Sequence, residues 1–226
     1  IFYFSLSLIK IHVLNTSSNI TPRFLILLLA FFSLGIFSNF AITPEDTLSV
    51  NKDLFQSKAL LLKNEGEYDS AIRIYSKLLN FNVDYGQYDQ AIWNLLQISD
   101  LYKKKRDIKS SLLIIDSALS IQKKYSKGEK ANHARILQHA GAVFITSGEY
   151  DTAYSLTKKS IQILLKEGKI NDTLLSKSYL NLGNYFWYIN NLDSALYNYR
   201  LALNKSNTMK DTIKNEIRAS ALQNIG

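Results

Sequence analysis

The sequence predicts an all-α protein built as a right-handed superhelical solenoid of antiparallel helix pairs. Two stretches, 137–161 and 179–203, align without a gap at an offset of 42 residues. The chain of 226 residues has only 9 Gly and 2 Pro, and both prolines precede the repeated part. A fixed period together with so few helix breakers favours a helical repeat array, in which stacked neighbours share one core.

The period extends beyond these two stretches. In the alignment Gly141 falls on Gly183, and one step of 42 residues back places Ser111 on Ala153. A further step of 40 residues reaches GEYDSAIRIYSKLL at 66–79. We therefore expect four units at about 52–91, 92–133, 134–175 and 176–218, with a fifth, cut short, at 219–226.

Each unit is predicted to contain two helices joined by a tight turn. In the last complete unit the helices are expected at about 174–189 and 192–206. The turns are expected where residues that tolerate the left-handed backbone conformation, or the equivalent positions of other units, occur: Gly66, Lys105-Arg106, Gly148 and Asn190-Asn191. An aspartate starts the second helix in three units, where it can accept a free backbone N–H: Asp69, Asp151 and Asp193.

Small residues recur at positions where the two helices of a unit should meet. Gly141 and Gly183 in first helices, and Ala71, Ala153 and Ala195 in second helices, allow close approach of the backbones. Large side chains are expected to fill the space beside them: Tyr102, Phe144, Phe186 and Tyr199.

These residues resemble the tetratricopeptide repeat (TPR), whose pattern is W-x2-L-G-x2-Y followed by A-x3-F-x2-A. The resemblance covers about 52–226, within an expected array at 42–226, and weakens in the earlier units. The period near 42 is longer than the usual 34 and is similar to the TPRs of kinesin light chains and of bacterial proteins with a CHAT protease domain. An unrelated α-solenoid or helix bundle is the alternative. Unit four has residues at all seven positions of the pattern: Tyr179, Leu182, Gly183, Phe186, Ala195, Tyr199 and Ala202.

The resemblance implies a concave groove, lined by the first helix of each unit, that binds a peptide or a partner protein. The aromatic residues among the implied positions could instead pack against a neighbouring unit. Cations, amides and aromatics together suit a peptide with an acidic or aromatic element. The implied groove residues are Trp93, Asp100, Lys103, Lys104, Arg135, Gln138, Lys177, Asn184, Trp187 and Tyr188.

Catalytic and metal-binding chemistry is not expected. The chain has no Cys, which excludes disulfides, thiolate zinc sites and a cysteine nucleophile. His133 and His139 are six residues apart on one predicted helix and do not share a face, and His12 lies in the leader. Phosphate-binding and hydrolase motifs are missing as well. We therefore expect no cofactor, no metal and no enzymatic activity in this stretch.

The net charge of +8 is a modest basic excess. Residues 42–226 hold 25 basic and 19 acidic residues, and the densest basic run, 103–106, falls at a predicted helix end. Cations are favourable there because of the helix dipole. A nucleic-acid interface would need basic clusters repeated on one face, so nucleic acid is not an expected partner.

Residues 1–41 are expected to be a leader. Residues 24–40 are apolar and follow Arg23. The run is shorter than the roughly 20 residues of a membrane span and is typical of a secretory signal, either cleaved or retained as an anchor. A buried core helix is the alternative. The chain begins without Met, so residues 1–20 are either an upstream extension of the reading frame or the start of a fragment.

From these observations we expect an exported or membrane-anchored protein of the periplasm or cell envelope that acts as an interaction scaffold. A second hypothesis is a regulatory or sensory segment of a signalling enzyme. Its effector, a CHAT-type protease, a histidine kinase or a DNA-binding regulator, would then follow residue 226. A third is a purely structural role without a specific ligand.

Overall fold

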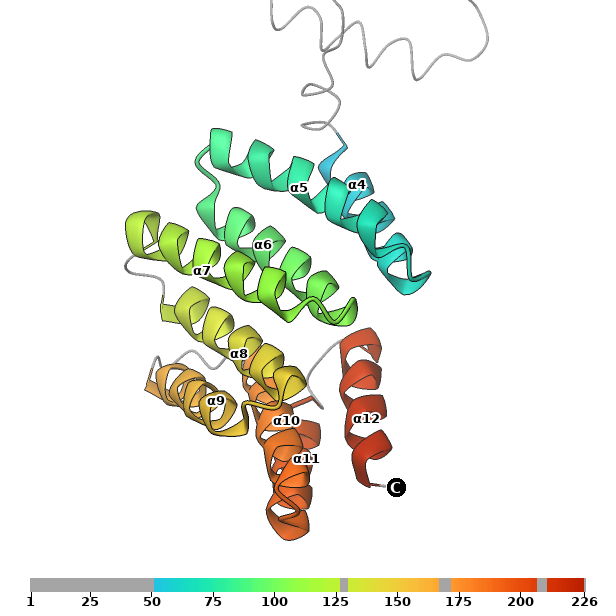
Figure 1. Cartoon of the computed structure of the whole chain (residues 1–226), viewed down its shortest axis with the longest axis vertical. Coiled ribbons are helices and arrows are strands. Elements are labelled where there is room, and N and C mark those ends of the chain that lie inside the picture. Colours follow the sequence, from blue (N-terminus) through green and yellow to red (C-terminus); the bar gives the residue numbers. More distant parts are fainter. Residues whose placement is uncertain (1–50, 127–129, 167–171, 207–210, 226) are drawn as a thin grey trace, which may run out of the picture. The chain divides into compact units, whose positions relative to one another are not determined.

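The computed structural model describes residues 51–126, 130–166, 172–206 and 211–225, which belong to a compact unit, Leu48–Gly226. The leader expected at 1–41, with its apolar run 24–40, lies outside these residues. Within the described ranges every element is an α-helix (Figure 1). The helices are α4 Lys52–Asn64, α5 Tyr68–Asp84, α6 Tyr88–Lys104, α7 Ile108–Tyr125, α8 Lys130–Ser147, α9 Tyr150–Lys166, α10 Asp172–Tyr188, α11 Leu192–Ser206 and α12 Asp211–Ile225.

The helices pack in the order in which they follow one another along the chain. Each of α4 to α11 contacts the next helix, as in a series of antiparallel hairpins. We call α4, α6, α8, α10 and α12 the first helices and α5, α7, α9 and α11 the second helices. The first helices α6, α8, α10 and α12 also contact one another in succession. The all-α class and the consecutive helix packing are thereby confirmed.

Five tight turns of the described chain share one backbone geometry. The residue that ends each turn's left-handed step has a φ of +60° to +85°. The next amide donates to the carbonyl five residues earlier, for example Glu67 N–H to Leu62 O at 2.8 Å. This pattern satisfies the last carbonyls of the helix. The residues with positive φ are Gly66, Gly86, Arg106, Gly148 and Asn190, so the four turns predicted inside the units are confirmed and Gly86 adds one between α5 and α6.

Arg106 is the costly member of this set, because a residue with a Cβ is strained at a φ of 62°. Arg106→Gly is expected to raise the free energy of unfolding by about 0.5–1 kcal/mol. Lys77→Gly, in the exposed interior of α5, is the matched control and should lower it by about 1 kcal/mol. Urea unfolding of the two variants measures both effects. Equal losses in the two variants would show that the turn gains nothing from glycine.

The expected aspartate caps are only partly correct. Asp69, Asp151 and Asp193 lie in the first turn of their helices, where a carboxylate complements the helix dipole. The side chains that accept a backbone N–H belong to the preceding position instead. Asp107 Oδ1 accepts from Ser110 N–H at 3.1 Å, and Asn191 Oδ1 accepts from Ser194 N–H at 3.1 Å. Asp69 is paired with Lys105 on the surface.

Unit boundaries differ from the alignment in two places. The helix α6 begins at Tyr88, before the expected boundary at 92, and α12 begins at Asp211, before the expected 219. Both differences arise because the alignment followed small core residues in the middle of helices, whereas the chain folds back at the turns that precede them.

Close helix approach explains the small residues of the pattern. A Cβ added to Gly183 would overlap the ring of Tyr199, which is fully buried. A Cβ added to Gly141 would overlap Thr157 Oγ1 and lie 3.3 Å from the backbone oxygen of Ala153. The predicted packing of first on second helices is confirmed in both units.

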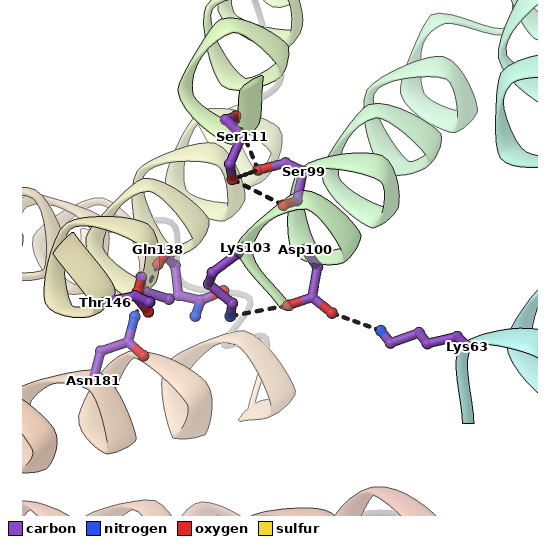
Figure 2. A network of polar contacts seen from close by, with 9 residues as sticks. Lys63, Ser99, Asp100, Lys103, Ser111, Gln138, Thr146 and Asn181 are labelled. Atoms are coloured by element: carbon purple, nitrogen blue, oxygen red, sulfur yellow. Dashed lines mark hydrogen bonds and ion pairs between the residues drawn. The ribbon is translucent and has the colours of Figure 1, made fainter. Parts of the chain in front are cut away.

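Serine replaces alanine at one of these close contacts. Ser111, aligned with Ala153, is fully buried opposite Ser99. The two hydroxyls lie 2.8 Å apart, and each also donates to the other residue's backbone oxygen, as Figure 2 shows. Mutual hydrogen bonding satisfies both hydroxyls and offsets the cost of burying them.

Candidate functional site

The first helices surround a cavity of about 190 Å³, which we call the first-helix pocket. All five first helices contribute to its wall, including α4 and α12, the first and last described helices of the array. The wall is formed by Lys63, Gln97, Asp100, Lys103, Gln138, His139, Ala142, Lys177, Leu180, Asn181 and Ile217.

An ion triad occupies one side of this pocket. Asp100 of α6 lies between two lysines, with Lys63 Nζ of α4 at 2.7 Å from its Oδ2 and Lys103 Nζ at 2.9 Å from its Oδ1 (Figure 2). The side chain of Asp100 is 17% exposed. Burial alone would favour its neutral form, but Lys103 and Lys63 outweigh that effect and hold the pKa of Asp100 well below its usual value. The carboxylate is therefore ionised at neutral pH.

His139 of α8 forms another part of the wall. Burial lowers the pKa of His139 to about 3, and the positive charges of Lys103, Lys177 and Lys63 act in the same direction against the weaker influence of Asp100. The imidazole is therefore neutral at pH 7, where one ring nitrogen donates a hydrogen bond and the other accepts one.

Two amide side chains complete the polar wall. Asn181 of α10 donates from Nδ2 to the backbone oxygen of Gln138 at 2.8 Å. Gln138 is 5% exposed, and its Oε1 has no hydrogen-bond partner among the described residues. A buried acceptor without a donor costs about 1–3 kcal/mol. A ligand that brings an N–H or O–H to this atom would remove that cost.

Four of the ten residues implied for the groove meet in this pocket: Asp100, Lys103, Gln138 and Lys177. Three others have roles inside the array. Trp93 packs edge-on against Tyr75 with ring centroids 5.8 Å apart. Arg135 donates to Asn132 at 2.8 Å, and Asn184 accepts from the Tyr199 hydroxyl at 2.9 Å.

The remaining three implied residues are exposed and lie outside the pocket wall. Lys104 ends α6, and Trp187 and Tyr188 end α10. Tyr188 stacks on Tyr150 of α9, with ring centroids 5.0 Å apart. The aromatic pair joins neighbouring hairpins, as the packing alternative for these residues anticipated, and the face of Trp187 stays accessible.

Sequence reasoning missed five residues of the wall. Gln97 lies one turn before Asp100, Asn181 one turn after Lys177, and His139 directly after Gln138. Helical spacing from the predicted residues could have indicated the first two. Lys63 and Ile217 come from the first and last units, where the repeat pattern is weakest, and no sequence signal indicated them.

Two further searches of the described ranges gave no candidate. No group of three or more His, Asp or Glu there could hold a metal ion. None of the helices in those ranges is both long and apolar enough to cross a membrane.

Comparison with known proteins identifies a similar fold and no family. No protein-family model matches the chain, and no curated protein gives a significant match. Among solved structures, the chain is similar to BtubC (BKLC) from P. vanneervenii, with a TM-score of 0.54 and 16% sequence identity. The match covers 81% of this chain and 68% of that one. At this identity the similarity concerns the helical fold alone.

Proposed function

We propose that this chain is a protein-interaction scaffold of the TPR type that binds a peptide segment of a partner along its first helices. The observation that carries the proposal is the first-helix pocket, in which polar side chains from separate helices face one cavity. In this proposal the array winds as a right-handed superhelix and the pocket lies on its concave side.

The character of the pocket wall supports binding rather than a purely structural role. Packing alone would favour apolar side chains between these helices, because buried charges are costly unless they are paired. Instead, Asp100, Lys63 and Lys103 form ion pairs at the cavity, and Gln138 leaves an acceptor without a partner. Buried polar groups around a cavity are characteristic of a ligand site.

The fold supports the TPR assignment. The small residues Gly141 and Gly183 lie where their Cβ atoms would overlap the second helix. Tight turns of one geometry recur between helices, and the last complete hairpin has residues at every position of the TPR pattern. The likeness to a solved helical structure points the same way.

Peptide selection followed by affinity measurement tests this proposal. Peptides that bind the immobilised chain are selected from a random display library and titrated against two variants of equal charge. Lys63→Met/Lys177→Met alters the pocket, and Lys77→Met/Lys123→Met alters exposed positions on the second helices α5 and α7. We expect at least about tenfold weaker binding to the pocket variant, a loss of about 1.4 kcal/mol, and less than twofold change for the control. Equal affinity for both variants would refute binding at the pocket.

A further inference from the structure

We propose that the first-helix pocket binds a phosphoryl group, an inference that rests on the proposed function and names the chemistry of its ligand. Three ammonium groups reach the cavity wall from three different helices: Lys63 from α4, Lys103 from α6 and Lys177 from α10. Lysine acts as a compact point charge in phosphate recognition. Donors that approach from three directions match the tetrahedral oxygens of a phosphoryl group.

The charge of the triad favours a strongly charged anion. Asp100 compensates only one of the two lysines that it contacts, so the Lys63–Asp100–Lys103 triad retains one positive charge. Lys177 adds a third cation to the same wall. The influence of these three lysines also reaches His139, since burial first and then their charges lower its pKa. The cavity therefore has a positive potential despite its internal carboxylate.

Asp100 also discriminates against a carboxylate ligand. It already occupies the position between Lys63 and Lys103 that a ligand carboxylate would take, with the same charge and short contacts of 2.7 and 2.9 Å. A phosphoryl group carries about −1.5 to −2 charges and three acceptor oxygens, so it competes for the lysines more effectively. No arginine is part of the wall, so the planar fork that suits a carboxylate is missing.

The neutral groups of the wall fit the rest of such a ligand. His139, neutral at pH 7, provides one N–H donor beside the lysines. Gln138 Oε1, buried and without a partner among the described residues, can accept from a peptide N–H or a protonated phosphate oxygen. A cavity of about 190 Å³ is smaller than the roughly 300–1,000 Å³ of drug-sized ligand sites. It accommodates one charged group rather than a length of peptide.

Calorimetric titration of the whole chain tests this inference. The probes are inorganic phosphate, N-acetyl-phosphoserine amide and N-acetyl-glutamate amide, at equal ionic strength because salt screens such interactions. We expect at least one of the two phosphoryl compounds to bind at least tenfold more tightly than the glutamate compound. Tight binding of inorganic phosphate would identify a free phosphate as the source. Preference for the phosphoserine compound would identify a modified side chain of a partner.

Three variants locate the binding. Lys63→Met is expected to weaken phosphoryl binding at least tenfold, and Lys77→Met on α5 should leave it unchanged. Asp100→Asn is expected to strengthen binding several-fold because it removes the competing carboxylate, a gain that loss of structure cannot imitate. If Asp100→Asn does not fold, as circular dichroism would show, the Lys63→Met and Lys77→Met pair decides.

Two results would overturn the inference. One is equal or tighter binding of the glutamate compound, and the other is no phosphoryl binding at millimolar concentrations. If display-selected peptides still depend on Lys63 and Lys177 in that case, the proposed function stands and only the phosphoryl assignment fails.

Discussion

Tyr199→Ala is expected to lower the free energy of unfolding by about 3–5 kcal/mol, the range for removal of a large buried aromatic side chain. The ring is fully buried against Gly183 of α10, and its hydroxyl donates to Asn184 at 2.9 Å. Tyr197→Ala on the same helix removes a side chain that is 62% exposed and should cost less than about 1 kcal/mol. Urea unfolding monitored by circular dichroism compares the two.

A double-mutant cycle with Gly183 tests the physical reason. Gly183→Ala alone should destabilise the protein, because its Cβ overlaps the Tyr199 ring and overpacking costs about 1–3 kcal/mol. In the Tyr199→Ala background the same change should be neutral or stabilising, since the ring is gone and alanine favours a helix by about 1 kcal/mol. Additive losses would show that close packing on this ring does not explain the glycine.

The second large effect is a dependence of stability on pH that originates at His139. Its pKa is about 3 in the folded chain and about 6.5 when unfolded. Between these values the unfolded state binds more protons, so stability is complete above pH 6.5 and decreases as the pH falls. The slope is at most about 1.4 kcal/mol per pH unit, which gives about 1–3 kcal/mol between pH 6.5 and 4.

Unfolding of the chain and of His139→Gln at several pH values measures this term. The glutamine variant should lose less stability over the window, and the difference between the two curves should grow as the pH falls. Asp100 acts in the opposite part of the scale. Its lowered pKa stabilises the fold above about pH 3.9, and that contribution disappears only in stronger acid. Parallel curves for the two proteins would show that His139 titrates normally.

The helical class and most turns could be predicted because they depend on local chemistry. Glycine or asparagine at three of the four predicted turns, and small residues at the helix contacts, are constraints that act within a single hairpin. The turn at Gly86 was missed although Gly86-Gln87-Tyr88-Asp89 repeats the pattern of Gly66-Glu67-Tyr68-Asp69 at the preceding turn. The alignment at 42 residues compared equivalent turns of successive units, and this turn lies between two units.

The pocket was harder to predict because it depends on how hairpins are oriented against one another. Asp100 and Lys177 were assigned to the groove from their place in the repeat, and both line the pocket. The pairing of Asp100 with Lys63 joins α6 to α4, and no spacing within one unit indicates it. Trp93 was assigned to the groove by the same reasoning, but it packs against Tyr75 in the core between hairpins. A rotation of a few tens of degrees about the helix axis separates these outcomes.

The central claim is that the first helices, rather than the second helices, bind the partner. Chemical-shift mapping by NMR of the chain, titrated with a display-selected peptide, tests it most directly. The account predicts that the largest changes occur at Lys63, Asp100, His139 and Lys177 on four first helices. Largest changes on α5, α7, α9 and α11, with these four residues unaffected, would contradict it.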